Sequence, residues 1–274
     1  MVFAGKASTQ SSNSLKLRLL SSVVGIPVLL TFIWAGSPWL LVLVVAVVIL
    51  GLLEFYRMVR VQRAWLQRLP GLVIGVSLVA AGGYEQSLWL PVVIALSLPV
   101  FYLSYRGTSA QVRPWLLTVA GPMYLGATLA YVTLLRGLDE GASWLMLAVL
   151  GTFAADTSAY LVGKAIGRHH MAERVSPGKT WEGAMAGLAG GVVATVLLAN
   201  LFPMALEPWQ AFLLGAGIGV VSQAGDLMES MLKRAANVKD AGWVIPGHGG
   251  LLDRLDSIVL SLVLVYYGAT WGVT

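Results

Sequence analysis

The chain reads PWQAFLLGAGIGVVSQAG from 208 to 225, DLMESMLKRAANVKDAGWVIPGHGGLLDRLD from 226 to 256, and SIVLSLVLVYYGATWGV from 257 to 273. Two apolar runs of membrane length therefore enclose a polar stretch that contains Asp226, Glu229, Asp253 and Asp256. A carboxylate at the centre of a membrane helix costs about 2.5–3.5 kcal/mol when it faces lipid. These side chains are therefore expected to face protein, water or ions, which predicts a functional site at the ends of two membrane helices.

The composition predicts the same class for the whole chain. Hydrophobic residues make up 57% and charged residues 11%, whereas soluble proteins carry about 25% charged residues. An apolar run of about 20 residues is long enough to cross a bilayer. We expect an all-α polytopic membrane protein, folded as one domain, with about nine transmembrane helices at 17–34, 39–56, 69–84, 88–104, 115–137, 142–163, 183–202, 208–227 and 255–273. The absence of cysteine excludes disulfides, thiolate nucleophiles and cysteine metal sites.

The basic residues predict the orientation, because Lys and Arg favour the cytoplasmic side of a membrane protein. With a cytoplasmic N-terminus and nine spans, all of the 18 basic residues except Arg136 fall inside. We therefore expect a multi-pass protein of the bacterial inner (plasma) membrane with a periplasmic C-terminus and an active site at the cytoplasmic face. That face suits anionic lipid headgroups and polyphosphates, and no nucleic-acid partner is expected.

The chain divides into three regions by composition. Residues 1–16 are polar and Ser-rich and are predicted to be disordered. The run at 17–34 has the basic flank of a signal peptide but no A-x-A-like cleavage site, so it is predicted to be a retained span. Residues 17–137 form a five-helix membrane region in which Glu54 is expected to pair locally with Arg57. Residues 138–274 form a four-helix region that carries nearly all of the chemistry.

Span six contributes the first candidate site residues. Asp156 and Tyr160 are four residues apart and share a helix face, which Lys164 continues toward the cytoplasm. The same spacing also fits a structural Asp–Lys pair that holds span six against its neighbours. Both interpretations stay open at this point.

The loop after span six resembles an anion site. Ser176, Lys179 and Thr180 precede Glu182 at the predicted N-terminus of a helix, where free backbone N–H groups and the helix dipole favour phosphate. The segment is not a P-loop, because it lacks the G-x-x-x-x-G-K spacing and a preceding strand. Small residues then favour close helix packing over ligand contact; they are Gly183, Gly187, Gly190 and Gly191.

The carboxylates of the last two spans predict a metal site. Asp226, Glu229 and Lys233 recur at i, i+3 and i+7 and lie on one helix face, together with Ser230. Asp253 and Asp256 share a face on the next helix. Carboxylates that converge from two helix ends without a His or Cys cluster suit a hard cation, and Mg²⁺ held by carboxylates and substrate phosphates is the natural candidate.

Cations and a glycine-rich loop surround that site. A polyphosphate substrate requires such positive charge, which is supplied by Lys233, Arg234, Lys239 and Arg254. The segment 246–250 reads PGHGG, where a nucleotide can approach the backbone closely. His248 lacks a second His of metal-ligand spacing, so we interpret it as a substrate contact.

Residues 230–256 resemble the phosphatidate cytidylyltransferase (CDP-diacylglycerol synthase) family. They match its signature, S-x-φ-K-R-x₄-K-D-x-small-x₂-φ-P-x-H-G-G-φ-x-D-R-φ-D with φ apolar, at every defined position. The segment from Asp156 to Gly183 is also similar, although Gly178 stands where a basic or polar residue is expected. The resemblance implies transfer of CMP from CTP to phosphatidic acid, in a lipid bilayer, giving CDP-diacylglycerol and pyrophosphate. Its nucleophile is already an anion, so charge stabilisation and positioning are needed more than a general base.

The resemblance also implies residue roles. The implied catalytic residues are Lys233, Arg234, Lys239, Asp240, His248 and Arg254. The implied substrate-binding residues are Asp156, Tyr160, Lys164, Ser176, Lys179, Thr180, Glu182, Glu229, Ser230, Gly249 and Gly250. Family members resemble one another in a two-cation centre, which implies that Asp226, Asp253 and Asp256 are metal ligands for Mg²⁺ and a second cation, either K⁺ or another divalent ion. The family also implies a homodimer.

Two other functions are compatible with parts of the sequence. A CTP-dependent polyprenol or phytol kinase would bind CTP but would phosphorylate a lipid hydroxyl, for which it would need a base. An ion-coupled transporter would use the buried carboxylates for a coupling ion and would show two related halves. The two halves of this chain show no repeat, since the polar residues concentrate in the second half.

Overall fold

A computed structural model describes residues 25–59, 68–82, 112–242 and 249–271. In chain order its elements are a short helix Gly25–Ala35, α2 (Trp39–Met58), α3 (Arg68–Ala81), α5 (Val112–Gly121), η3 (Pro122–Gly126), α6 (Ala127–Arg136), α7 (Gly141–Ile166), β1 (His170–Ala172), β2 (Ser176–Thr180), α8 (Trp181–Leu201), α9 (Pro208–Ala235) and α10 (Leu252–Trp271). The predicted span 88–104, and part of the span 17–34, lie outside the described residues.

Several of these helices have membrane length. Among the described residues, five are long and apolar enough to cross a bilayer: Trp39–Met58, Leu116–Arg136, Gly141–Ile166, Trp181–Leu201 and Pro208–Ala235. The helix Gly25–Ala35 and α3 are apolar but shorter. The protein is therefore mostly helical with membrane-length spans, as its composition predicts. The number nine and the orientation of the termini stay predictions.

Helix α9 continues past the predicted end of the membrane span near residue 227 to Ala235, so it includes the predicted helix face of Asp226, Glu229 and Lys233. One local feature differs from the sequence-based expectation. The segment expected to be a loop after span six contains an antiparallel hairpin, in which His170 pairs with Thr180 and Ala172 with Ser176. The hairpin is the one departure from an all-helical fold among the described residues.

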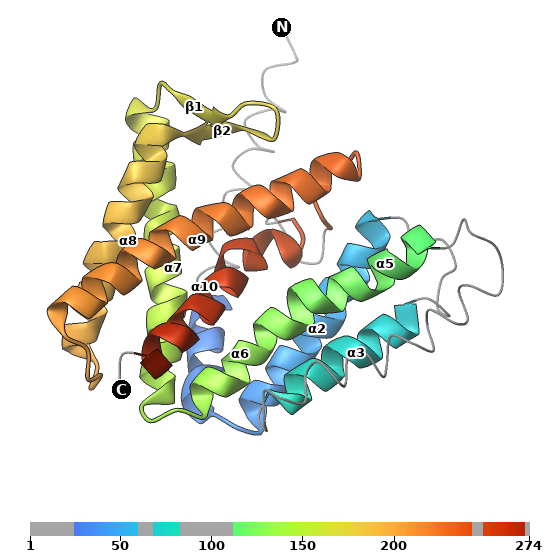
Figure 1. Cartoon of the computed structure of the whole chain (residues 1–274), viewed down its shortest axis with the longest axis horizontal. Helices are drawn as coiled ribbons and strands as arrows, with labels where there is room; N and C mark the ends of the chain where they lie inside the picture. The colour runs from blue at the N-terminus through green and yellow to red at the C-terminus, as the bar shows by residue number, and fades with distance from the viewer. Residues whose placement is uncertain (1–24, 60–67, 83–111, 243–248, 272–274) are drawn as a thin grey trace, which may run out of the picture.

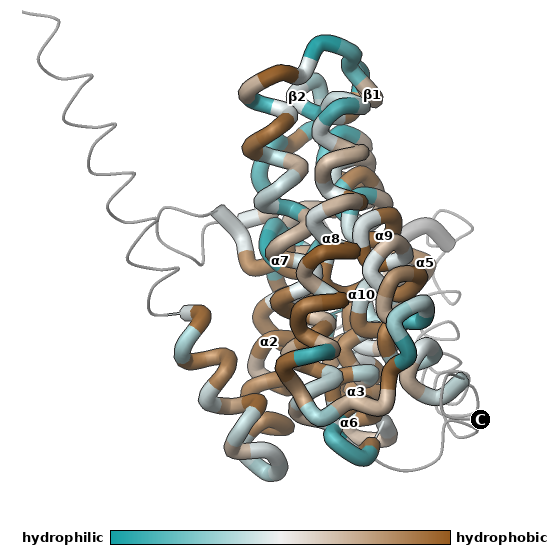
Figure 2. Tube along the Cα trace, turned by 90° about the vertical axis from the view of Figure 1, so that its left-hand side faces the viewer, coloured by the Kyte–Doolittle hydropathy of each residue, from teal (hydrophilic) through white to brown (hydrophobic). Residues whose placement is uncertain are grey.

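Helix α10 lies at the centre of the helical arrangement. It packs on α9 and α7 on one side and on α6 and α2 on the other, while α2 also packs on α3. Figure 1 shows the hairpin at the end of α7 and α8, with α9 crossing both of these helices. In Figure 2 the hairpin end is hydrophilic, while the helices below it are mostly hydrophobic.

Small residues bring α7, α8 and α9 into close contact. A Cβ on Gly191 would lie 2.7 Å from the carbonyl oxygen of Gly215, and one on Gly219 would lie 2.6 Å from the Cα of Leu188. On the other face of α8, a Cβ on Gly183 would lie 2.7 Å from the carbonyl oxygen of Ala159. These glycines therefore pack helices together, as the sequence pattern predicts.

Candidate active site and metal centre

The close crossing of α9 and α10 builds the site. A Cβ on Gly225 would collide with the backbone carbonyl of Asp256, so only glycine lets the two helices approach this closely. The crossing places Asp226 and Glu229, on the polar face of α9, beside Asp256 in the second turn of α10. One ligand oxygen from each of these three carboxylates lies within 4.8 Å of the others.

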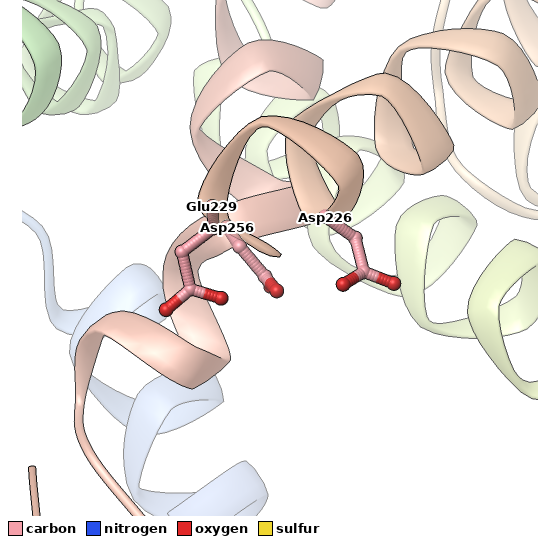
Figure 3. Close-up of side chains that lie close together, drawn as sticks. All are labelled: Asp226, Glu229 and Asp256. Atoms are coloured by element: carbon pink, nitrogen blue, oxygen red, sulfur yellow. The ribbon is translucent and has the colours of Figure 1, made fainter. Parts of the chain in front are cut away.

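This group, called here the carboxylate triad (Asp226, Glu229 and Asp256), has the chemistry of a cation site. Figure 3 shows the three side chains extending toward the same side of the two helices. Glu229 and Asp256 are 1% and 8% exposed, and Oε1 of Glu229 has no hydrogen-bond partner within the described part of the chain. Clustered buried carboxylates repel one another, and oxygen ligands of this kind suit Mg²⁺. The residues present therefore fit a hard divalent cation.

Asp253 lies next to the triad but is engaged by protein donors. Its Oδ1 is 2.7 Å from Nζ of Lys233, and its Oδ2 accepts hydrogen bonds from the N–H groups of Gly250 at 2.8 Å and Ala241 at 3.1 Å. Burial raises the pKa of the Asp253 carboxyl, but Lys233 and the backbone donors outweigh it and hold that pKa below its usual range. Lys233 also contacts Oε2 of Glu229 at 2.8 Å. The structure thus gathers two of the three predicted metal ligands with Glu229, and it pairs the third with Lys233.

Two further elements supply polar groups to the same place. Nζ of Lys179, on β2, lies 2.7 Å from Oδ2 of Asp226 and donates to the carbonyl of Gln223 at 3.3 Å. Asp156, on α7, accepts a hydrogen bond of 2.7 Å from the hydroxyl of Ser257, which follows Asp256 on α10. Lys179 therefore contacts the triad directly, whereas Asp156 bonds to Ser257, next to Asp256, rather than to a lysine of its own helix.

The other candidates on α7 and the hairpin have different surroundings. Tyr160 is 63% exposed, and Nζ of Lys164 lies over its ring, 5.7 Å from the centroid. The hydroxyl of Thr180 accepts from the N–H of Gly183 and caps α8. Glu182 accepts from the backbone N–H groups of Arg168 and His169 and pairs with the His169 ring. Thr180 and Glu182 thus fix the hairpin to α8.

The remaining predicted residues are not members of the carboxylate triad. Arg234 is exposed and its Nε donates to the carbonyl of Val175 in the hairpin at 3.2 Å. Gly249 has a φ of +84°, a left-handed conformation that favours glycine. Lys239, Asp240 and Arg254 are exposed, Ser230 is buried, Ser176 opens β2, and Gly178 has open space around its Cα. His248 lies outside the described residues.

Comparisons with known proteins assign the chain to a family. The pattern of the cytidylyltransferase family matches residues 16–270. The chain belongs to the cytidylyltransferase family. It is 33% identical over 281 residues to the phosphatidate cytidylyltransferase of Synechocystis, covering 91% of this chain and 94% of that protein. It is 32% identical to that of Brucella abortus, over 95% of both chains, and 31% identical to that of Bacillus subtilis, over 92% of this chain and 97% of the relative.

Two residues of this cytidylyltransferase family member were not predicted from the sequence. Ser257 carries no signal except its place after Asp256, yet its hydroxyl joins α10 to α7. Glu54 was expected to pair with Arg57, and that expectation is not met. Arg57 is exposed, whereas Glu54 is buried and accepts a hydrogen bond from the N–H of Leu252 at 3.0 Å. A contact between residues so far apart in sequence leaves no local pattern.

Proposed function

We propose that this chain transfers CMP from CTP to phosphatidic acid, giving CDP-diacylglycerol and pyrophosphate in phospholipid biosynthesis. The observation that carries the proposal is the carboxylate triad at the crossing of α9 and α10, bordered by Lys179 and Lys233. A polyphosphate–metal complex requires carboxylates for the cation and ammonium groups for the phosphates. Both kinds of group meet here, within a chain that aligns with phosphatidate cytidylyltransferases over nearly its full length.

The reaction needs charge stabilisation rather than a strong base. A phosphate oxygen of phosphatidic acid forms a bond to the α-phosphorus of CTP. The bond from that phosphorus to the β-phosphate oxygen breaks, and pyrophosphate leaves with the electron pair. Since the nucleophile is an anion, no proton has to be removed in this step. The protein must hold two anions together and offset the charge that builds on the leaving group.

The triad would hold Mg²⁺ in this reaction. The ion, when bound, supplies positive charge that offsets the negative charge of the triphosphate. Asp253 has both oxygens occupied by protein donors, so we propose that it orients Lys233, and that it becomes available to a second cation, K⁺ or another divalent ion, when Lys233 turns to the substrate. Lys179 and Lys233 are then the groups that contact phosphate oxygens.

The other residues act around this centre. We propose that Thr180 and Glu182 act indirectly, because they fix the hairpin that carries Lys179. Direct contact with the nucleotide or the lipid phosphate is proposed for Asp156, Tyr160, Lys164, Ser176, Ser230, Arg234, Lys239, Asp240, His248, Gly249, Gly250 and Arg254.

The proposed setting is a bacterial inner membrane. The N-terminus and the hairpin lie on the cytoplasmic side, where CTP is available, and the C-terminus lies in the periplasm after nine spans. The proposed regions are a polar N-terminal segment at 1–16, a five-helix membrane region at 17–137 and a four-helix catalytic region at 138–274. The partners are CTP, phosphatidic acid, the bilayer and a second copy of the chain in a homodimer.

The test is a product analysis with purified protein, phosphatidic acid, Mg²⁺ and CTP labelled at either the α- or the γ-phosphate. Cytidylyl transfer puts the α-label into the lipid and the γ-label into pyrophosphate. Supplying a polyprenol or phytol instead tests the kinase alternative, which would put the γ-label into the lipid and leave CDP. An absence of any CTP-dependent lipid product with phosphatidic acid would refute the proposal.

A further inference from the structure

Glu54 is a buried carboxylate that the proposed reaction does not use. It lies on α2, in the N-terminal region, and is 1% exposed. A buried carboxylate without partners is strongly unfavourable, so its surroundings indicate what it does. Those surroundings consist of Gly242 and Gly250, which lie on either side of the segment 243–248, and the start of α10.

The carboxylate binds the N-terminus of α10. Its Oε2 accepts a hydrogen bond of 3.0 Å from the N–H of Leu252, the first residue of that helix. The first N–H groups of a helix have no partner within the helix, and the positive end of the helix dipole favours an anion. Glu54 therefore serves as an N-terminal cap that is supplied by a different helix.

Two signature glycines contact the same carboxylate. A Cβ on Gly242 would collide with Oε1 of Glu54, and one on Gly250 would lie 2.8 Å from Oε2 and 2.7 Å from the backbone nitrogen of Gly242. A side chain at either position would therefore displace the Glu54 carboxylate, and at Gly250 it would also collide with the backbone of Gly242. Gly242 and Gly250 lie on either side of the segment 243–248, which contains Pro246 and His248 of the signature.

Asp253 binds the backbone at the same two places in the chain. Its Oδ2 accepts from the N–H groups of Ala241 and Gly250. Glu54 and Asp253 thus contact residues at both ends of the segment 243–248. Asp256 lies four residues after Leu252, one turn further along α10. A displacement of the start of α10 therefore displaces a member of the carboxylate triad.

We propose that Glu54 is a positioning residue that sets the place of Gly242, Gly250 and Asp256, and so the affinity of the site for CTP and Mg²⁺. This inference rests on the proposed function for its kinetic part. It gives the N-terminal helices a role in the site, because Glu54 joins α2 to the start of α10 and to the glycines of the signature. On this proposal Glu54 acts through Leu252 and the glycines.

The experiment compares three changes at Glu54 with a control on the same helix. Glu54→Ala removes the acceptor, Glu54→Asp keeps the charge but shortens the reach, and Glu54→Gln keeps the reach but removes the charge. Leu52→Ala is the control, because Leu52 is fully buried two residues away and packs against Gly75 and Gly121 instead. KM for CTP, the Mg²⁺ concentration for half-maximal rate, kcat and thermal stability are measured for each.

The hydrogen bond to a charged acceptor is the interaction lost, so we expect Glu54→Ala to raise KM for CTP and the Mg²⁺ requirement by about tenfold or more. Leu52→Ala should lower thermal stability without raising either. Glu54→Asp should raise KM for CTP and the Mg²⁺ requirement more than Glu54→Gln does. The comparison of these two variants tests the proposal if Glu54→Ala does not fold. Equal KM and Mg²⁺ requirement in Glu54→Asp, Glu54→Gln and Leu52→Ala would overturn the proposal.

A second measurement does not depend on the reaction. Amide hydrogen exchange over residues 249–256 should be faster in Glu54→Asp than in wild type and unchanged in Leu52→Ala. Unchanged exchange in Glu54→Asp would also overturn the positioning role. If wild type forms no CDP-diacylglycerol, the proposed function fails, while this measurement still decides on Glu54.

Discussion

The ammonium group of Lys179 lies 2.7 Å from the carboxylate of Asp226. The lysine comes from the hairpin and the aspartate from α9, so the ion pair joins the hairpin to the carboxylate triad. Without substrate, the lysine offsets part of the negative charge of the triad. When an anionic triphosphate and a cation arrive together, the lysine can turn to a phosphate oxygen and leave Asp226 to the cation.

Lys179→Met should therefore weaken CTP binding. We expect KM for CTP to rise by about 10–100-fold, because a charge-assisted hydrogen bond contributes about 1.5–3 kcal/mol. The stability should change little, since the Asp226 side chain is 42% exposed and solvent screens the pair. Steady-state kinetics check the first point and thermal unfolding the second. Arg174→Met, an exposed change in the same hairpin, should leave KM unaltered; an equal rise there would point to general loss of positive charge.

The triad predicts stabilisation by Mg²⁺. Saturating the site to about 100 times its Kd should raise the free energy of unfolding by about 2.7 kcal/mol. The rise should vanish in Asp226→Asn and Asp256→Asn, and Glu229→Gln should reduce it. Asp139→Asn, at an exposed turn, is the matched control and should respond as wild type does. If Mg²⁺ still raises the free energy of unfolding in all three triad variants, the cation does not bind at this site.

Substitutions of the triad carboxylates and of Asp253 should differ in their effects on activity and on Mg²⁺ binding. Asp226→Asn and Asp256→Asn should each lower kcat by more than about 100-fold, equivalent to about 2.7 kcal/mol in the barrier. Asp253→Asn should also lose activity, but through Lys233 and the loop, so its Mg²⁺ shift in thermal unfolding should survive. Loss of that shift in Asp253→Asn would show that Asp253 binds the cation directly. If a variant keeps its kcat within about tenfold of the wild-type value, the substituted residue is not part of the metal centre.

Lys233 should contribute to folding as well as to catalysis. It bridges Glu229 and Asp253, whose side chains are 1% and 11% exposed. Breaking a buried pair by removing one partner costs about 3–5 kcal/mol, because the other charge stays buried. Lys233→Met should lower the free energy of unfolding by that amount, measured by denaturant titration. Adding Glu229→Gln should recover part of the loss; if the two losses simply add, the bridge carries no coupling.

The sequence predicted the helical class and part of the geometry of the candidate site because both depend on local patterns. Apolar run length revealed α2, α7, α8 and α9, and helix spacing placed Asp226, Glu229 and Lys233 on one face. The hairpin was not predicted because strands of three and five residues are too short to show a clear alternation of polar and apolar residues. The contacts of Glu54 with Leu252 and of Ser257 with Asp156 escaped because each joins distant helices, which only packing brings together. The same packing decided that Asp253 pairs with Lys233 and that Glu229 joins the triad.

The orientation of the chain in the membrane can be tested with single cysteines on either side of α7. Helix α7 has 26 residues and is about 39 Å long at 1.5 Å per residue, enough to cross a hydrocarbon core of about 30 Å. Asp139 precedes it and Glu173, in the hairpin, follows it, and both are exposed. Because the chain has no cysteine, Asp139→Cys and Glu173→Cys each introduce a single reactive thiol.

A membrane-impermeant maleimide should label Asp139→Cys in intact spheroplasts, whereas Glu173→Cys should react only after the membrane is opened. A reporter fused after Thr274 should likewise be periplasmic, and one between residues 57 and 68 cytoplasmic. The physical reason is the excess of Lys and Arg on the hairpin side of the spans. Labelling of Glu173→Cys in intact spheroplasts would put the triad on the side without CTP, and the proposed reaction could not then proceed in the cell.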